Sequence, residues 1–195
     1  MPDNSDHITV ESEKRRIINR LKRLEGQVRG LQTMIESQKE CQAVLTQILA
    51  AKSALTQVGM HIIGYSMKTC LATGATSNRD ELIQNAFEVF IRYRNLSAST
   101  PDPKSIAPGD RVQMITRLHR LEDEIKHIQQ LLEDGTECET ILGELSGATA
   151  TIGDVGLAVL GHSMQGCLIQ DSGQSRDDLI DEAIQVFLKY ADCVK

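Results

Sequence analysis

Four cysteines recur at one spacing and are the residues of this chain best suited to chemistry. Cys41 and Cys70 are 29 residues apart, and so are Cys138 and Cys167. In a helix, this spacing brings both side chains to within about 20° of the same face. It also separates the two thiols by roughly 43 Å along the helix axis. Two thiols of one helix therefore cannot react with each other.

An antiparallel partner helix would bring the thiols together. If the helix pairs with a copy of itself, centred near residues 55–56, each cysteine faces the distal cysteine of the copy. Within this chain the pairs would be Cys41 with Cys167 and Cys70 with Cys138. Between two chains, Cys41 would face Cys70 of its neighbour. Cys41 and Cys138 also lie in or just after a first helical turn, where the helix dipole favours thiolate. The alternative is that all four are small buried hydrophobic residues.

The chain contains one unit twice. A shift of 97 residues aligns GYSMKTCL (64–71) with GHSMQGCL (161–168), and it also aligns the two cysteine pairs. Such self-similarity indicates a duplicated structural unit. The fifth cysteine, Cys193, has no counterpart and is predicted to be incidental. The expected organisation is repeat 1 at 1–96, a Pro/Ser-rich linker at 97–109 and repeat 2 at 110–195.

Each repeat is predicted to form three helices. Capping-box patterns at Ser37–Glu40 and Asp134–Glu137 predict the starts of the second helices, and the second helix of repeat 1 could run to about residue 72. A short third helix is expected from Asn78. The fold class is therefore all-α, and repeat 1 is expected to pack on repeat 2, on another chain, or on both. Apolar residues form a heptad seam in each first helix: Ile17, Leu21, Leu24, Val28, Leu31 and Ile35, and Met114, Leu118, Leu121, Ile125, Ile128 and Leu132.

Basic residues gather in the first helix of repeat 1. Residues 1–97 carry a net charge of +3 and residues 98–195 a net charge of −9, which together give the −6 of the chain. Lys and Arg on one helix are typical of phosphate contacts, whereas the alternative is a solvated basic helix. The candidate DNA-binding residues of this helix are Lys14, Arg15, Arg16, Arg20, Lys22, Arg23 and Arg29.

The composition argues against several other classes of protein. The chain has 195 residues, of which 41% are hydrophobic, and no apolar run approaches the length of a membrane span. Its first residues do not resemble a signal peptide, so we expect a cytoplasmic protein. A Gly-rich phosphate loop, a Ser-His-Asp arrangement and a candidate acidic pair are all missing from the sequence, which argues against an enzyme. No cofactor is expected.

The segments NRLKRLEGQVRGL (19–31) and LTQILAAKSAL (45–55) resemble the CsoR/RcnR family of bacterial metal- and thiol-responsive repressors. The resemblance covers residues 12–95 and, more weakly, 109–192. It implies three-helix protomers that form antiparallel four-helix dimers and then tetramers, with inducers bound between second helices. Two tandem chains would accordingly form a homodimer that is a pseudo-tetramer of repeats.

The resemblance also implies that operator DNA is contacted by the first helix together with one basic residue of the second helix. That residue is Lys52 in repeat 1, and Thr149 stands at the equivalent position of repeat 2. Repeat 1 is therefore expected to supply most of the DNA contact.

Copper sensors of this family are implied to hold the metal with a cysteine, a histidine 25 residues later and a second cysteine. Ser66 and Ser163 stand at the histidine positions here, so the nitrogen ligand is lost. His162 adjoins Ser163, but its counterpart is Tyr65, so we expect no shared metal role for it. The departure resembles the persulfide-sensing, CstR-like branch, in which cysteines become joined by di- to tetrasulfide bridges.

We therefore predict a repressor that senses persulfide or polysulfide and then releases DNA. Its sensing thiols are Cys41, Cys70, Cys138 and Cys167, and no metal site is expected. One alternative keeps the family but changes the inducer to Cu(I), another metal held by these four cysteines, or an electrophile. A second alternative is a thiol or interaction protein that does not bind DNA.

Overall fold

The computed structural model describes the backbone of residues 4–72, 84 and 111–169, and side chains of residues 11–67, 84 and 111–162. Within these ranges it contains four long helices and no strand, which confirms the all-α prediction. The helices are α1 (Asn4–Glu36), α2 (Cys41–Ala72), α4 (Arg111–Glu133) and α5 (Cys138–Ile169). None of the helices in these ranges is suited to span a membrane. The predicted linker, the helix from Asn78 and Cys193 lie outside the described residues.

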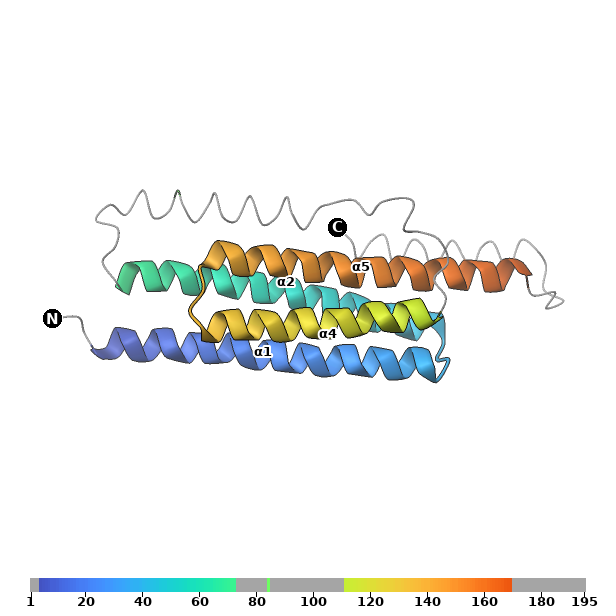
Figure 1. The fold of residues 1–195 in the computed structure, drawn as a ribbon, viewed down its shortest axis with the longest axis horizontal. Helices are drawn as coiled ribbons and strands as arrows, with labels where there is room; N and C mark the ends of the chain where they lie inside the picture. The colour runs from blue at the N-terminus through green and yellow to red at the C-terminus, as the bar shows by residue number, and fades with distance from the viewer. Residues whose placement is uncertain (1–3, 73–83, 85–110, 170–195) are drawn as a thin grey trace.

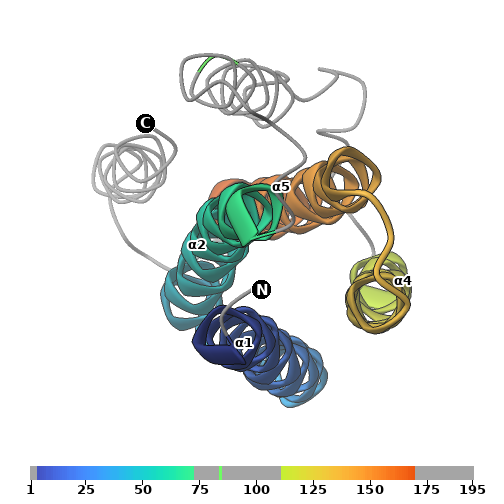
Figure 2. The same cartoon turned by 90° about the vertical axis from the view of Figure 1, so that its left-hand side faces the viewer.

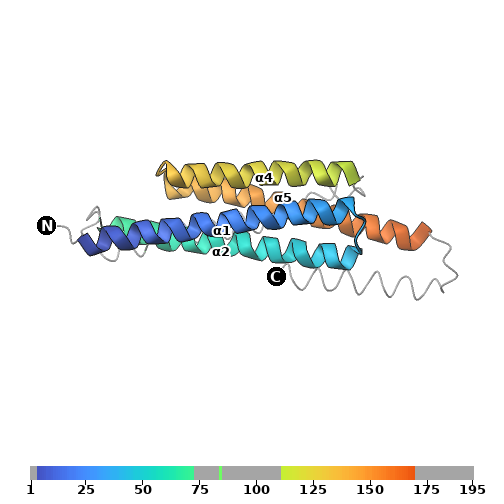
Figure 3. The ribbon, with the colours of Figure 1, turned by 90° about the horizontal axis from the view of Figure 1, so that it is seen from below.

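The two repeats pack on each other as an antiparallel four-helix bundle (Figure 1). Seen end-on, the helices follow the order α1, α2, α5, α4 around the bundle, and each contacts its two neighbours (Figure 2). The colours of Figure 1 show that α2 runs antiparallel to α5, and α1 antiparallel to α4. Consequently α5 extends past the other helices at one end, and at the opposite end α1 and α2 both extend past α4 and the start of α5 (Figure 3). The antiparallel pairing of second helices is thus formed within one chain.

Both predicted heptad seams form the core. Each of their twelve residues is at most 9% exposed, and ten of them at most 2%. Apolar residues of α2 and α5, such as Ile48, Leu55, Leu145 and Ile152, complete this core and are also fully buried. Burying one such side chain contributes about 1.5–3 kcal/mol, so the seams account for the packing of one repeat on the other.

Small residues lie in the middle of the α2–α5 pair. The Sγ atom of Cys138 lies 4.0 Å from the carbonyl oxygen of Ile62, so α5 begins beside that turn of α2. Counting along both helices from this contact at equal rise brings Ala51 and Ala148 to about the same level. Both alanines are fully buried. The helices therefore cross about four residues nearer to the start of α2 than the expected centre at residues 55–56, where small side chains let the backbones approach.

Equivalent turns end α1 and α4. Gln38 and Gly135 occupy the same position of the two repeats and have φ angles of 54° and 73°, the left-handed conformation common after a helix C-terminus. The predicted capping role of Ser37 is wrong. Its hydroxyl donates to the carbonyl of Thr33 at 2.7 Å, so Ser37 helps to end α1 instead of beginning α2.

A pseudo-symmetric polar network crosses the α1–α4 interface. Gln32 donates to Glu122 at 3.4 Å, and its counterpart Gln129 donates to Glu25 at 3.3 Å. The Arg29 Nε atom also lies 3.3 Å from Glu122 Oε1. Equivalent glutamines of the two repeats therefore each donate a hydrogen bond to the equivalent glutamate of the other repeat. These bonds fix how α1 packs against α4.

Candidate thiol sites and DNA-binding surface

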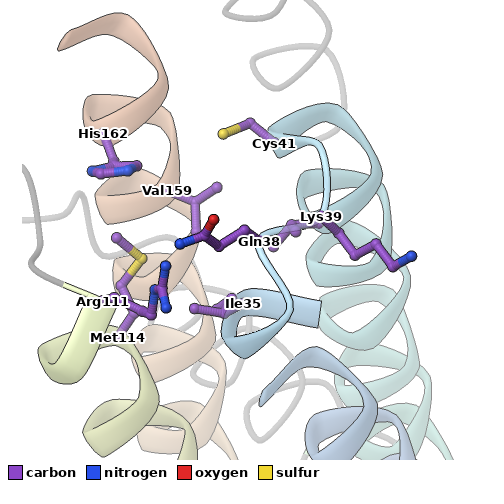
Figure 4. Close-up of a pocket in the computed structure, with 9 residues that line it drawn as sticks. Ile35, Gln38, Lys39, Cys41, Arg111, Met114, Val159 and His162 are labelled. Carbon is purple, nitrogen blue, oxygen red and sulfur yellow. The ribbon is translucent and has the colours of Figure 1, made fainter. Parts of the chain in front are cut away.

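A pocket of about 360 Å³ lies between the start of α2 and the C-terminal half of α5. Cys41 lines it from α2, and Val159 and His162 line it from α5. Figure 4 shows the Cys41 sulfur pointing from α2 toward the α5 wall that carries His162. Cys41 is a half-buried thiol, whereas His162 is exposed. A small solute that enters this pocket therefore meets a sulfur and an imidazole from different repeats.

Basic side chains border the same pocket. Lys39 comes from the turn before α2, and Arg111 comes from the first turn of α4. The Gln38 side chain adds an amide, and Ile35 and Met114 add an apolar wall. The pocket thus combines a nucleophile with groups that attract anions.

The opposite end of the bundle carries the equivalent position, Cys138. Its half-buried thiol contacts the carbonyl oxygen of Ile62, which is the counterpart of Val159. Tyr65, the counterpart of His162, is half-buried. Lys14, the counterpart of Arg111, donates to the main-chain oxygen of Glu133 at 3.1 Å and so caps the end of α4.

Cys41 and Cys138, the first cysteines of α2 and α5, each lie beside the C-terminal half of the opposite helix. That half contains the predicted partner, Cys167 for Cys41 and Cys70 for Cys138. Cys70 and Cys167 lie within α2 and α5, but their side chains are outside the described residues. Cys167 follows His162 by five residues, about 7.5 Å along the axis of α5. Among the side chains that are described, no group of three or more His, Cys, Asp or Glu residues is arranged to hold a metal ion.

The predicted DNA-binding residues of α1 differ in their exposure and in their partners. Arg15, Lys22 and Arg23 are exposed, and so is Arg16, which lies 3.6 Å from Glu13. Arg20 is half-buried. In contrast, Arg29 forms ion pairs with Glu25 and Glu122, and Lys14 caps α4. The contacts of Arg29 with Glu122 and of Lys14 with Glu133 depend on the neighbouring helix α4, so the sequence pattern alone could not reveal them.

The equivalent surface of repeat 2 offers fewer available cations. Val112, Gln113 and His119 replace Arg15, Arg16 and Lys22, and Val112 is 66% exposed. Arg120 Nε pairs with Glu124 Oε1 at 2.9 Å. The Nη1 atom of Arg117 is buried and has no hydrogen-bond partner among the described residues.

Lys52 lies on α2 and is half-buried. Burial lowers the pKa of its ammonium group, because desolvation disfavours the charged form. Its counterpart Thr149 is buried and donates its hydroxyl to the carbonyl of Leu145 at 2.8 Å. The repeats therefore differ at this position in charge as well as in exposure.

Sequence reasoning missed three members of the Cys41 pocket. The tyrosine counterpart of His162 gave no reason to assign it a shared role, and Arg111 is remote from every cysteine in the sequence. Lys39 lies only two residues before Cys41, but its charge was not connected with the thiol. His162 joins the pocket because α5 runs antiparallel to α2 and places Val159 and His162 beside Cys41, whereas Arg111 reaches it from the start of α4 and Lys39 from the turn before α2. The register of α2 on α5 would have revealed His162, and the short spacing to Cys41 would have revealed Lys39.

Comparisons with known proteins match both repeats. Residues 13–92 and 110–189 each match the family model of metal-sensitive transcriptional repressors. The chain is 35% identical over 98 residues to the copper-sensing transcriptional repressor CsoR of Bacillus subtilis, a match that covers 48% of this chain and 97% of that protein. It is 48% identical over 52 residues to the copper-sensing repressor RicR of Mycobacterium tuberculosis, covering 27% of this chain and 54% of that relative. No solved structure matches the chain.

Proposed function

The chain belongs to the CsoR family of metal-sensitive transcriptional repressors and carries the family unit twice, and from this premise we propose that it senses reactive sulfur. In this proposal, persulfide or polysulfide joins cysteines of α2 and α5, and the repressor then releases its operator. The observation that carries the proposal is that Cys41 faces α5 of the other repeat across an accessible pocket. Ser66 and Ser163 stand where the family resemblance implies a histidine ligand, which favours thiol chemistry over metal binding.

The sulfur step uses only the protein thiols and the donor. The thiolate of Cys41 attacks a polysulfide sulfur, an S–S bond of the donor breaks, and the shorter polysulfide leaves with the electron pair. Cys41 then carries a persulfide. The thiolate of Cys167 attacks the Cys41 sulfur, the persulfide bond breaks, and hydrosulfide leaves. Two thiols are thereby oxidised to a disulfide, and one donor sulfur is reduced to sulfide.

The observed register favours bridges that contain extra sulfur atoms. Cys41 is level with Val159, and Cys167 lies eight residues, about 12 Å, further along α5. A direct disulfide requires Cα atoms within about 7 Å of each other. When the donor leaves a longer sulfur chain on Cys41, attack at its second sulfur gives a trisulfide and again releases hydrosulfide or a shorter polysulfide.

The DNA-binding surface is proposed to lie on repeat 1. Arg15, Lys22 and Arg23 are exposed on α1, whereas the corresponding basic positions of repeat 2 are replaced or paired with carboxylates. Phosphate contacts require cations that are accessible to the duplex. Two tandem chains would present two such surfaces, so the proposed DNA-binding species is a homodimer of chains. Light scattering coupled to size exclusion would measure its mass, and a mass of one chain would contradict this assembly.

A sulfur bridge can act on this surface through the bundle. It would tie the start of α2 to the far end of α5, and α1 is joined to α2 by a short turn. Because packed helices shift between discrete arrangements, a bridge that changes the α2–α5 crossing would change the angle of α1. That angle determines whether both basic surfaces of a dimer can reach the same operator.

Peptide mapping after treatment with sodium tetrasulfide tests the proposed chemistry. Intrachain Cys41–Cys167 and Cys70–Cys138 bridges should appear in chains that run as monomers on non-reducing gels. Bridges between Cys41 and Cys70 of two chains would instead run as covalent dimers. Absence of any bridge at concentrations of tetrasulfide that modify a small-molecule thiol would contradict the proposal.

Cu(I) is the second candidate inducer, and one observation favours it. His162 lines the pocket of Cys41 and supplies an imidazole one residue away from the predicted ligand position. The Cys138 end has Tyr65 at the equivalent position, so the family donor set of two thiolates and an imidazole fits one of the two sites at most. The test is an anaerobic Cu(I) titration of the DNA complex. If Cu(I) releases the DNA and tetrasulfide forms no bridge between cysteines, the inducer is copper and not reactive sulfur.

A further inference from the structure

The two thiol sites differ in charge although they arise from one repeated unit. Residues 36–42 around Cys41 carry one net negative charge, whereas the equivalent residues 133–139 around Cys138 carry four. The difference comes from Lys39, which Thr136 replaces, and from two carboxylates that the Cys41 site lacks. These carboxylates are Asp134 and Glu139, whose counterparts are Ser37 and Gln42.

The basic residues near the two cysteines also make different contacts. Arg111 lines the Cys41 pocket, and the exposed Lys39 lines it as well. At the other end, the counterpart Lys14 donates to the main-chain oxygen of Glu133. Arg111 therefore lines the Cys41 pocket directly, and Lys39 adds a positive charge at its edge with the ammonium pointing away from Cys41 (Figure 4). The corresponding lysine near Cys138 is committed to a helix end.

The side chains opposite the two sulfurs differ as well. His162 lies across the pocket from Cys41, toward which the Cys41 sulfur points (Figure 4). An imidazole can accept the thiol proton and later return it to a leaving hydrosulfide. Tyr65 stands at the equivalent position for Cys138. A phenol is a poor proton acceptor near neutral pH, so this exchange is not available there.

We propose that the two thiol sites are not equivalent, and that the Cys41 pocket is the entry site for anionic sulfur donors. Polysulfides and persulfides are anions at neutral pH, so Lys39 and Arg111 attract them while the carboxylates around Cys138 repel them. Cys41 is modified first, by attack of its thiolate on the donor and departure of a shorter polysulfide. The duplicated chain thus responds through one sensitive site instead of two equal ones. This inference rests on the proposed sulfur-sensing function.

Two alkylating reagents that differ in charge separate this effect from simple accessibility. The full chain is treated with iodoacetate, an anion, or with neutral iodoacetamide, and the rate at each cysteine is measured by peptide mass spectrometry. The ratio of the Cys41 rate to the Cys138 rate should be about fivefold to tenfold larger for iodoacetate at low salt. The difference should shrink in concentrated salt, which screens the charges. Equal ratios for the two reagents would overturn the proposal.

The repeats themselves supply matched variants, because each residue can be exchanged for its counterpart. Lys39→Thr, Ser37→Asp and Gln42→Glu together give the Cys41 site the charges of the other end, and Thr136→Lys, Asp134→Ser and Glu139→Gln make the reverse change. Thr136 is half-buried and the other exchanged residues are exposed, so the fold should be retained, and α-helical circular dichroism verifies it. The preference for iodoacetate should fall in the first variant and rise at Cys138 in the second. Unchanged preferences in both would show that charge does not select the site.

Failure of the inference can be told from failure of the proposed function. Substoichiometric tetrasulfide should add sulfur to the Cys41 peptide before the Cys138 peptide, and His162→Tyr should reduce this lead. If both peptides are modified equally and DNA is still released, the inequivalence is wrong and sulfur sensing stands. If Cys41 shows the charge preference but tetrasulfide leaves DNA bound, the pocket assignment stands and sulfur sensing is wrong.

Discussion

The sulfur of Cys138 lies 4.0 Å from the main-chain oxygen of Ile62, a residue of the other repeat. This contact fixes where α5 begins against α2. Because the repeats are related by pseudo-symmetry, it agrees with the position of Cys41 beside Val159, the counterpart of Ile62. The same register of α2 on α5 therefore holds both Cys41 and Cys138 against the opposite repeat. A shift in that register would change the surroundings of both thiols.

The ion-paired carboxylate of Glu122 should stabilise the bundle above acidic pH. A hydrogen bond from Lys126, with further contributions from Gln32 and Arg29, lowers the pKa of this carboxyl below its ordinary value of 4.5. Its contribution is present above that value and is lost as the pH falls through the lower folded-state pKa. Glu122→Gln should therefore cost about 1 kcal/mol of unfolding free energy at pH 7 and reduce the dependence of stability on pH in acid.

Urea denaturation of the Glu122→Gln variant at pH 7 and at pH 3 measures this effect. Asp123→Asn is the matched control, because Asp123 is 78% exposed and only approaches Lys126 at 3.6 Å. It should change stability by less than about 0.5 kcal/mol. Equal effects of the two substitutions would show that the interface between α1 and α4 does not depend on Glu122.

Gln38 is strained relative to its counterpart, because it adopts a φ of 54° that glycine accepts without a steric penalty. Gln38→Gly should therefore raise the unfolding free energy, by up to about 1 kcal/mol. Gly135→Gln, the reverse exchange at a φ of 73°, should lower it by a similar amount. Thermal unfolding of both variants checks the prediction, and a loss of stability with Gln38→Gly would contradict it.

Arg23 and Arg120 are equivalent residues with different surroundings. Arg120 pairs with Glu124 at 2.9 Å, whereas the counterpart of that glutamate in repeat 1 is Gln27. Arg23→Ala should weaken operator binding and reduce the slope of log affinity against log salt by about one unit. Arg120→Ala should leave both nearly unchanged. Equal losses, measured by fluorescence anisotropy over a range of salt, would show that both repeats contact DNA alike.

Lys52→Thr separates DNA binding from stability, because Thr149 shows that threonine is accepted at this position. Burial lowers the pKa of the Lys52 ammonium, so the charge is held at some cost in the folded protein. Its removal should therefore leave the unfolding free energy unchanged or slightly higher, while operator affinity falls. An unchanged affinity, measured in the same anisotropy assay, would remove Lys52 from the DNA-binding surface.

Periodicity was sufficient to predict the core, because both heptad seams were read from apolar spacing and every one of their residues is buried. The cysteine spacing also predicted an antiparallel pairing of second helices, but it left open whether the partner helix belongs to the same chain. The register could not be derived in this way, since it depends on where Ala51 and Ala148 allow the helices to approach. The same limit hid His162 and Arg111, whose place in the Cys41 pocket depends on that register. Arg29 and Lys14 carried basic charge in the sequence, but their carboxylate and carbonyl partners lie on α4.

The most direct test of sulfur-controlled repression is the affinity for a labelled operator from the chain's own locus, measured by anisotropy before and after treatment with sodium tetrasulfide. Treatment should lower the affinity at least tenfold, a reducing agent should restore it, and Cys41→Ser should bind DNA normally without responding. A wild-type chain that holds its operator equally tightly after every cysteine has reacted would contradict the account.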